Sequence, residues 1–400
     1  MDVFDKIHGY TDARDAIAAG LYPYFGVLDR HEGTEVRLAG KDAIMCGSNN
    51  YLGLTNDPRV IEASAAALAK FGTSCTGSRL LNGNLRLHEE LEAKLAEFYR
   101  KEDALVFPTG FQANLGTISA IASRGDVVLL DQEAHASAID AARLSGARVK
   151  FFRHNDAASL EQQLAARSPD AGVLVAVEGV YSMAGDICSL PEVDELARRY
   201  GARVLLDDAH GLGVLAGGRG TEAHFAVPDG SGGPQADLIT VTFSKSLASA
   251  GGAVVGSREV IHYLRHHARS LIFSASMTPA NTAAALAALR VLTEEPWRAE
   301  RAQSNAAYVR RALTDRGVNI GASMTPIVPV PLENVLRTFS VWKNLLARGV
   351  YVNAVVPPAA SCRLRMSFMA THTRAQLDHV VSAIAAELVD DVAEPTLLGV

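Results

Sequence analysis

An acid, an imidazole and a lysine stand near the ends of two apolar stretches in the middle of this 400-residue sequence. Asp207 and His210 follow the run Arg203–Leu206, and Lys245 follows the run Asp237–Thr242. Short apolar runs of this kind are typical of buried strands, and ligands of open α/β sheets bind beyond the carboxyl ends of such strands. The three side chains are therefore predicted to share one pocket.

These residue types suit the chemistry of pyridoxal phosphate (PLP). A lysine between small hydroxyl residues, Ser244 and Ser246, suits imine formation, and Asp207 at a strand end suits the partner of a protonated pyridine nitrogen. The alternative is that Lys245 is a surface lysine in a serine-rich loop, and that Asp207 and Asp208 are an ordinary pair at a strand end. We take the cofactor site as the working hypothesis.

A place for the phosphate is predicted where the short strand Ala104–Phe107 leads into Pro108-Thr109-Gly110-Phe111. A helix is expected to begin at this glycine turn. The first backbone N–H groups of a helix have no intrahelical partner and bind anions. Gly110 and Phe111 would supply those groups.

Two more strands lead to polar residues in the same way. The strand Asp126–Leu130 precedes His135, and the strand Val173–Val177 precedes Ser182. Alternating strands and helices imply an α/β fold with a mainly parallel sheet and right-handed crossovers. A lone histidine at a strand end is usually structural, but several polar residues at successive strand ends favour a site.

Towards the carboxyl end the pattern predicts a smaller α+β domain. The helix Ala280–Thr293 is expected to be the bridge to this domain. The elements expected within it are a helix from Trp297 onward, strand Ile327–Val330, helix Val335–Arg348, strands Val350–Val355 and Arg363–Met369, and helix Arg374–Leu388. Period-two alternation in the last strand directs Arg363, Arg365 and Ser367 to one face. An arginine facing a cleft suits a carboxylate, and an ion pair on an exposed sheet face is the alternative. We expect an amino-terminal arm over residues 1–50, a large domain over 51–285 and a small domain over 286–400.

The composition excludes several classes of function. The balance of 38 Lys+Arg against 44 Asp+Glu, with no basic block and an aromatic share of 6%, disfavours nucleic acid and anionic membranes as partners. No apolar run reaches the roughly 20 residues of a transmembrane segment. The four cysteines are far apart and indicate neither a zinc ribbon nor a disulfide framework. We expect a cytoplasmic protein with small-molecule substrates.

Two other motifs are weaker. The run Gly211–Ala216 matches the looser dinucleotide fingerprint G-x-G-x-x-A, but the glycines of 217–220 interrupt the helix that such a motif should open. His262 and His266 have a spacing that can bind metal, but no glutamate accompanies them in the metalloprotease arrangement and the neighbouring residues are basic. We expect neither a nicotinamide site nor a metal site.

The motifs together resemble the α-oxoamine synthase family of fold-type-I PLP-dependent enzymes along nearly the whole chain. The resemblance is carried by Ser48–Leu54, Gly77–Gly83, Thr109–Asn114, His135–Ser137, Asp207–His210, Thr242–Ser246 and Phe273–Pro279. Within the family, Cys75–Arg79, Phe243–Ser249 and Met369–Thr373 are most similar to bacterial serine palmitoyltransferases. The resemblance implies a large domain with a mainly parallel sheet, of the seven-stranded type, and a smaller α+β domain.

The resemblance also implies a role for each candidate residue. Lys245 would carry PLP as an imine and later remove the α-proton, Asp207 would pair with the ring nitrogen, and His135 would stack on the ring. His210 and Ser182 would lie near the 3-oxygen. The remaining groups would bind the phosphate (Gly110, Phe111, Thr242 and Ser244) and the amino-acid carboxylate (Arg365, with Asn49 nearby).

The implied reaction is a decarboxylative condensation of an amino acid with an acyl thioester, which gives an α-amino ketone. L-serine and palmitoyl-CoA are expected, whereas sibling enzymes use glycine or alanine and another acyl-CoA or acyl-carrier-protein thioester. Less expected are an aminotransferase, which needs no thioester, and an inactive regulatory subunit, which would lack Lys245. Family members are homodimers with shared active sites, so Ser274–Thr278 is expected to reach the site of the second subunit.

One departure concerns substrate choice. Some members have an arginine directly before the Pro-Pro that is here Pro357-Pro358, but this chain has Val356. A second arginine clamp is therefore absent at this position. The segment Ala359–Cys362 is also shorter than expected before the Arg365 strand.

Overall fold

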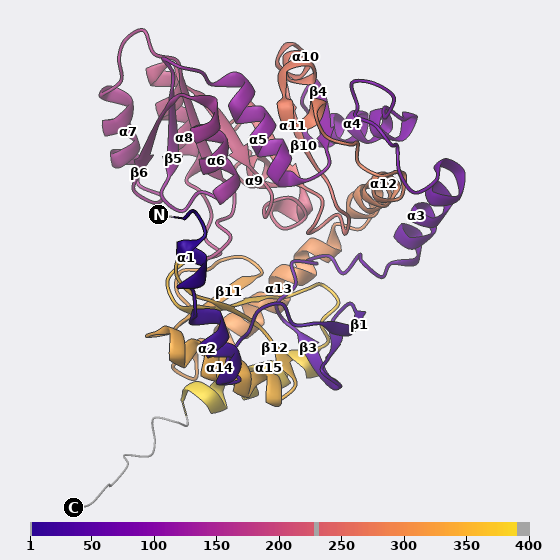
Figure 1. Ribbon diagram of the computed structural model, residues 1–400, viewed down its shortest axis with the longest axis vertical. Coiled ribbons are helices and arrows are strands. Elements are labelled where there is room, and N and C mark those ends of the chain that lie inside the picture. Colours follow the sequence, from indigo (N-terminus) through magenta and orange to yellow (C-terminus); the bar gives the residue numbers. More distant parts are fainter. Residues whose placement is uncertain (1, 228–231, 390–400) are drawn as a thin grey trace, which may run out of the picture.

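The computed structural model describes residues 2–227 and 232–389. A seven-stranded sheet forms the core of its upper part as seen in Figure 1. In spatial order its strands are β4 (Asp103–Phe107), β10 (Gly252–Gly256), β9 (Leu238–Thr242), β8 (Arg203–Asp207), β7 (Val173–Glu178), β5 (Val127–Asp131) and β6 (Arg148–Phe152). β10 is antiparallel to both neighbours, and the pairs from β9 to β6 are parallel. The predicted α/β class and mainly parallel sheet are confirmed.

Helices cover both faces of this sheet, because its strands are apolar on both sides. One face packs against α4 (Arg86–Tyr99), α7 (Ala157–Ala165), α8 (Leu190–Tyr200) and α12 (Pro279–Glu294). The other face packs against α5 (Gly110–Ile121), α6 (Ala136–Ser145), α10 (Arg258–His267) and α11 (Arg269–Ile272). Burial on two faces explains the nearly continuous Val, Leu and Ile runs in the sequence.

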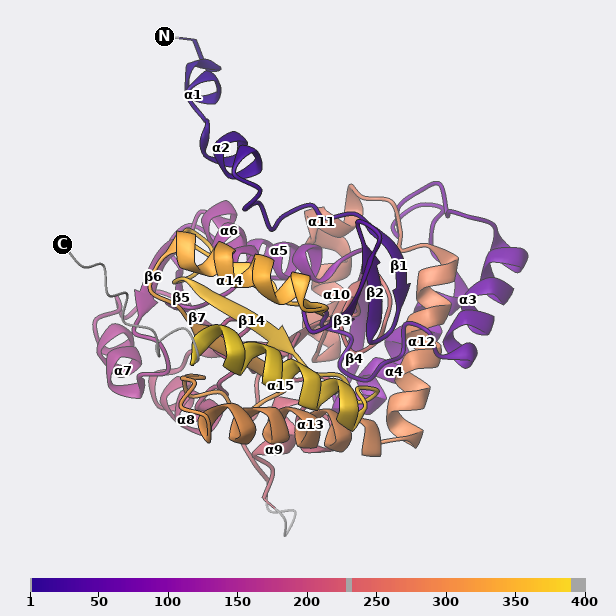
Figure 2. The same ribbon diagram turned by 90° about the horizontal axis from the view of Figure 1, so that it is seen from below.

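The carboxyl-terminal part has its own core around a three-stranded sheet of β11 (Ile327–Pro331), β14 (Arg363–Ser367) and β13 (Asn353–Val355). Its helices are α13 (Trp297–Thr314), α14 (Val335–Ala347) and α15 (Arg374–Leu388). Figure 2 shows them around β14, with the short helices α1 (Asp5–His8) and α2 (Asp12–Ala18) projecting away from the rest of the chain.

The single strand predicted over Val350–Val355 is wrong. β12 (Val350–Tyr351) pairs in parallel with β3 (Lys41–Met45), in a four-stranded sheet with β1 (Leu28–Glu32) and β2 (Glu35–Leu38), whereas β13 pairs with β14. The chain changes sheet at the buried Val352, and the uninterrupted apolar alternation gives no sign of the change. The pairing of β3 with β12 connects the amino-terminal segment to the carboxyl-terminal part, and the division at residues 50 and 285 stays a prediction.

The remaining elements include α3 (Pro58–Phe71), which packs against α12, and the short α9 (Thr221–His224). The glycine-rich run after His210 forms a turn and one 3₁₀ turn at Ala216–Gly218, and no α-helix opens there. Within residues 2–227 and 232–389, every helix is too short or too polar to cross a lipid bilayer.

Candidate active site

A cavity of about 280 Å³ lies at the carboxyl ends of the parallel strands. It brings together eight of the residues predicted from the sequence: Gly110, Phe111, His135, Asp207, His210, Thr242, Ser244 and Lys245. Other lining residues were not predicted, and the polar ones among them are Thr109, Asn114, Ser137, Glu178 and Thr240. Asn49, Ser182 and Arg365 lie outside the lining and reach it through hydrogen bonds.

Lys245 lies in the loop between β9 and β10, and its half-buried side chain faces the cavity rather than the surface. The Ser246 hydroxyl donates to the carbonyl of Leu212 at 2.7 Å, which fixes the loop. Among the described residues no hydrogen bond or ion pair engages the Lys245 ammonium. Burial lowers the pKa of Lys245, against the opposite effect of Asp207 and Glu178, so the neutral amine becomes accessible at a lower pH than in a free lysine.

Asp207 ends β8 with its carboxylate fixed on both oxygens. Oδ2 accepts from the side-chain amide of Asn114 at 2.6 Å, and Oδ1 accepts from the backbone N–H of Ala209 at 3.1 Å. Asn114 also donates to Ser137 Oγ at 2.9 Å and accepts from the Thr240 hydroxyl at 2.7 Å. This network sets the direction of the anion. Asn114 was not predicted as a site residue. Its position one turn into α5, after the glycine turn, could have indicated that its side chain lies near the cavity.

Both candidate histidines have one ring nitrogen engaged. His135 caps α6, where Nδ1 accepts from the N–H of Ser137 at 3.2 Å and hydrogen-bonds its hydroxyl at 2.7 Å. His210 is buried, and its Nδ1 hydrogen-bonds the hydroxyl of the fully buried Tyr51 at 2.7 Å. Burial, and then Lys245, lower the pKa of His210 far below its usual value, so its ring is neutral. Tyr51 was not predicted, because its contact joins distant parts of the sequence.

The amino terminus of α5 forms a cradle beside two hydroxyls. Thr109 caps the helix by accepting from the N–H of Gln112 at 3.1 Å, and Gly110 and Phe111 follow as its first residues. A Cβ on Gly110 would lie 2.6 Å from Cβ of Thr242, so only glycine fits. Thr242 Oγ1 and Ser244 Oγ are 2.9 Å apart at the same end. Unpaired helix N–H groups next to hydroxyls suit a phosphate.

Arg365 lies on β14, only 4% exposed, and contacts neutral oxygens. Its Nη1 donates to Oδ1 of Asn49 at 3.0 Å, and its Nε donates to the carbonyl of Ser182 at 2.6 Å. Asn49 Oδ1 also accepts from Tyr51, at 3.4 Å, which leads on to His210. An ion pair on an exposed sheet face is therefore excluded for Arg365. Ser182 takes part through its backbone: besides this carbonyl, its N–H donates to Glu178.

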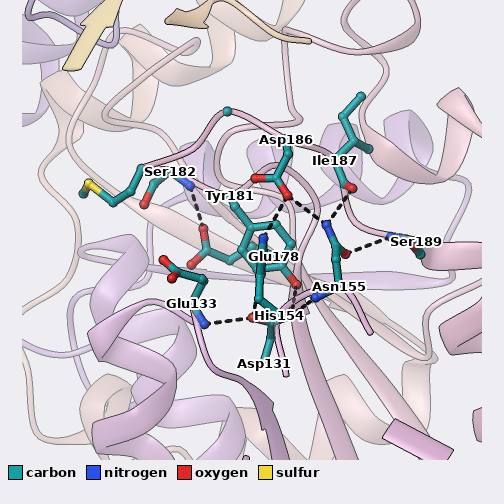
Figure 3. Close-up of polar contacts among 12 residues, drawn as sticks. Asp131, Glu133, His154, Asn155, Glu178, Tyr181, Ser182, Asp186, Ile187 and Ser189 are labelled. Atoms are coloured by element: carbon teal, nitrogen blue, oxygen red, sulfur yellow. Dashed lines mark hydrogen bonds and ion pairs between the residues drawn. The ribbon is translucent and has the colours of Figure 1, made fainter. Parts of the chain in front are cut away.

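A polar cluster supports the loop that carries Ser182 (Figure 3). His154 lies between two carboxylates, with Nδ1 2.9 Å from Asp131 and Nε2 2.8 Å from Asp186. Asp131 also accepts from the Tyr181 hydroxyl at 2.9 Å. Glu178 is close by, with Oε2 accepting from the N–H of Ser182 at 3.3 Å. Glu178 was not predicted, although it ends a strand as Asp207 does.

The metal alternative finds no support in the arrangement of its two histidines. His262 and His266 are exposed on α10, and Nδ1 of His266 hydrogen-bonds the carbonyl of His262. Across the described part of the chain, no three histidine, cysteine or acidic side chains are grouped as metal ligands.

Comparison with known proteins identifies the family. Residues 41–384 match the family model of aminotransferase class I and II. The serine palmitoyltransferase of Sphingobacterium spiritivorum is 45% identical over 94% of each chain, and the 8-amino-7-oxononanoate synthase of Alkaliphilus oremlandii is 40% identical over 90% of this chain and 92% of the relative.

Solved structures agree with this assignment. Serine palmitoyltransferase from S. paucimobilis with a bound PLP–myriocin aldimine has a TM-score of 0.91 and 37% identity, covering 97% of this chain and 98% of the other. The enzyme from Sphingomonas wittichii has a TM-score of 0.92 and 36% identity over the same shares. The resemblance and the fold type predicted from the sequence are confirmed. The chain belongs to the aminotransferase class I and II family and, within it, to the α-oxoamine synthases that include the serine palmitoyltransferases.

Proposed function

We propose that the protein is a PLP-dependent serine palmitoyltransferase, which condenses L-serine with a long-chain acyl thioester, palmitoyl-CoA being favoured, and releases carbon dioxide. The observation that carries the proposal is the half-buried Lys245, which makes no hydrogen bond or ion pair with the described residues and lines a cavity together with the fixed carboxylate of Asp207 and the amino terminus of α5. The similarity to serine palmitoyltransferases over nearly the whole chain supports the choice of reaction.

The residues of the cavity fit PLP. Lys245 would bind its aldehyde, Asp207 its ring nitrogen and His135 one face of the ring, while His210 and the Ser182 segment would lie towards the 3-oxygen. The phosphate would meet the N–H groups of Gly110 and Phe111 and the hydroxyls of Thr242 and Ser244. When bound, PLP supplies an electron sink that stabilises negative charge at the α-carbon of an amino acid.

The protein's own groups would manage protons and orientation around that chemistry. Asp207 would keep a proton on the ring nitrogen of the cofactor, because its carboxylate is fixed by two donors and shielded from water. Lys245 takes the α-proton at Nζ, for which its lowered pKa is suited. The neutral ring of His210 donates or accepts a hydrogen bond without adding charge.

Arg365 would bind the carboxylate of the amino acid with its planar fork, while Asn49 and Ser182 set its orientation. Val356 replaces the arginine found in some family members, so that position offers no second cation to a substrate. L-serine is favoured by the similarity to serine palmitoyltransferases, with glycine and alanine next.

A sibling α-oxoamine synthase is the second candidate, because 8-amino-7-oxononanoate synthases are also relatives at 40% identity. Such an enzyme would take another amino acid and another acyl thioester from coenzyme A or a carrier protein. An aminotransferase would release a keto acid without a thioester. The presence of Lys245 argues against an inactive regulatory subunit.

We also propose a cytoplasmic homodimer with shared active sites, in which Ser274–Thr278 approaches the site of the second subunit. In support, the apolar residues Leu81 and Phe273 are 80% and 74% exposed in the single chain, as expected of residues that a second subunit covers. Within the chain, Ser276 donates its N–H to the carbonyl of Gly77 at 2.9 Å, so Ser274–Thr278 lies beside the loop that contains Gly77 and Leu81.

The test combines labelling with product analysis. Borohydride should attach PLP to Lys245 in the purified protein, and L-serine should release carbon dioxide only when an acyl-CoA is present. Label on a different lysine would refute the cofactor site. Keto acid formation without thioester would instead identify an aminotransferase, and preference for glycine or alanine would identify a sibling synthase.

A further inference from the structure

Glu178 is a buried carboxylate in the cavity whose charge the proposed reaction does not use. It ends β7 in register with Asp207 of β8, and both residues line the cavity. Only 4% of Glu178 is exposed. Figure 3 shows its Oε2 accepting from the N–H of Ser182, whereas Oε1 is buried without a hydrogen-bond partner among the described residues. A free buried oxygen in a binding cavity calls for a partner.

The charges of the site leave one pair to be matched. Lys245 and Arg365 are basic, Asp207 and Glu178 are acidic, and none of the four forms a salt bridge within the described part of the chain. In the proposed function Asp207 meets the ring nitrogen, Arg365 meets the amino-acid carboxylate, and the amino terminus of α5 meets the phosphate. Of these four side chains, Lys245 and Glu178 are then the two that have no counterpart of opposite charge.

We propose that Glu178 is the counter-charge of Lys245. It is a positioning residue whose free Oε1 stabilises positive charge on Lys245 Nζ, and on the amino group of the substrate that takes the place of Lys245. The second half of this inference rests on the proposed function. The pairing of Glu178 with Lys245 does not rest on it, because both residues line the same cavity of the protein itself.

The electrostatics of the cavity agree with this pairing. Burial and Asp207 raise the pKa of Glu178 to about 8, although Lys245 and the backbone N–H groups of Ser182 and His135 favour its anion. Burial lowers the pKa of Lys245 to about 8, although Asp207 and Glu178 favour its cation. Each group therefore favours the charged form of the other. The ionisable groups around Glu178 are Asp207, Lys245, His135, His210, Tyr181 and Arg365. Of these basic groups, Arg365 donates through Nε and Nη1 to Ser182 and Asn49, whereas Lys245 makes no hydrogen bond or ion pair with the described residues.

The test measures Lys245 itself in cofactor-free protein. The rate at which trinitrobenzenesulfonate modifies Lys245 is followed against pH by mass spectrometry of its peptide. Glu178→Gln should shift the midpoint down by about one unit, and so raise the rate below the midpoint about tenfold, because it removes a nearby opposite charge. Glu133→Gln, the same change at an exposed side chain in the neighbouring loop, should leave the midpoint unchanged. An unchanged midpoint in Glu178→Gln would overturn the proposal.

Glu178→Asp covers the case in which the glutamine variant does not fold. It retains the charge but withdraws it by one methylene, so the midpoint should move in the same direction by a smaller amount, and no shift would again overturn the proposal. With PLP bound, the pH titration of its visible absorbance should shift downward in the same variants. If PLP fails to label Lys245 in the wild-type protein, the proposed function fails, while the cofactor-free midpoint still decides the role of Glu178.

Discussion

Adjacent carboxylates at the end of β8 have different surroundings. Asp207 faces the cavity, whereas Asp208 is fully buried and accepts from the Thr221 hydroxyl at 2.6 Å and the Tyr99 hydroxyl at 3.1 Å. Burial raises the pKa of Asp208 to about 7, although both hydroxyls favour its anion. Asp208 thus connects the loop after β8 with α9 and α4. Substitution of Asp207 should therefore affect catalysis, whereas substitution of Asp208 should affect stability.

We expect Asp207→Asn to reduce turnover at least about a hundredfold, roughly 3 kcal/mol in the barrier, because it removes a preorganised anion. Its melting temperature should change little. Asp208→Asn should instead lower the melting temperature and leave the kcat of the folded fraction within a few-fold. Steady-state kinetics and thermal unfolding of both variants check this, and turnover within threefold of wild type in Asp207→Asn would contradict the role at the ring nitrogen.

Arg365 provides a prediction on substrate binding. Arg365→Ala should raise the KM for the amino acid far more than the KM for the thioester, because only the amino acid bears the carboxylate that Arg365 is proposed to bind. Arg365→Lys should rescue binding only in part, since an ammonium lacks the bidentate fork. An equal loss for both substrates would remove this role from Arg365.

The sequence was informative about residues at strand ends and uninformative about residues that meet through folding. Asp207, His210 and Lys245 follow apolar runs that locate the edge of the sheet, so their shared cavity was predictable. Tyr51 and Asn114 enter the site through contacts across 159 and 93 positions of sequence. No local pattern reports such contacts.

At the scale of the elements, one loop supports Arg365, the arginine that is proposed to bind the substrate carboxylate. The loop after β7 supplies the Ser182 carbonyl to Arg365, and the His154 cluster connects this loop to β5. Burial lowers the pKa of His154, but its hydrogen bonds to Asp131 and Asp186 outweigh burial and raise the pKa to about 10. The net pKa of Asp131 is lowered, because His154 and backbone N–H groups outweigh its burial.

The cluster predicts a pH dependence of stability. A histidine whose pKa is raised by folding contributes full stability below its unfolded pKa of about 6.5 and loses it as pH rises through the folded value. We expect His154→Gln to cost about 3–5 kcal/mol near pH 6, because it leaves two carboxylates without their cation. The difference in melting temperature from wild type should shrink between pH 7 and pH 10. His262→Gln, at an exposed histidine, is the control, and a difference independent of pH would contradict the charged state of His154.

At the scale of the molecule, the site draws on separate sheets. The cavity belongs to the seven-stranded sheet, whereas Arg365 comes from the three-stranded sheet around which the carboxyl-terminal core is built. Because the two sheets come from separate parts of the chain, the sequence predicted each sheet well but predicted the contacts between them poorly. Between β12 and β13, next to Arg365, the chain passes from one sheet to another, and the apolar pattern of the sequence does not indicate this change.

Ligands that join these parts should stabilise the whole protein. PLP at a hundred times its Kd should contribute about 2.7 kcal/mol by mass action, and L-serine added to the PLP-loaded protein should raise the melting temperature further. In Arg365→Ala the increment from PLP should persist and that from L-serine should vanish. Differential scanning fluorimetry measures both, and a serine increment that survives in Arg365→Ala would show that the carboxylate is bound elsewhere.

The separate origin of Arg365 also bears on how the protein matures during synthesis. Gly251 is the last residue in the chain to line the cavity, and Arg365 follows only after helices α10 to α14. A chain emerging from the ribosome therefore contains every residue that lines the proposed cofactor cavity well before it contains the arginine proposed to select its substrate. The order of translation separates acquisition of chemical capacity from acquisition of specificity, and the second waits for the carboxyl-terminal part to fold.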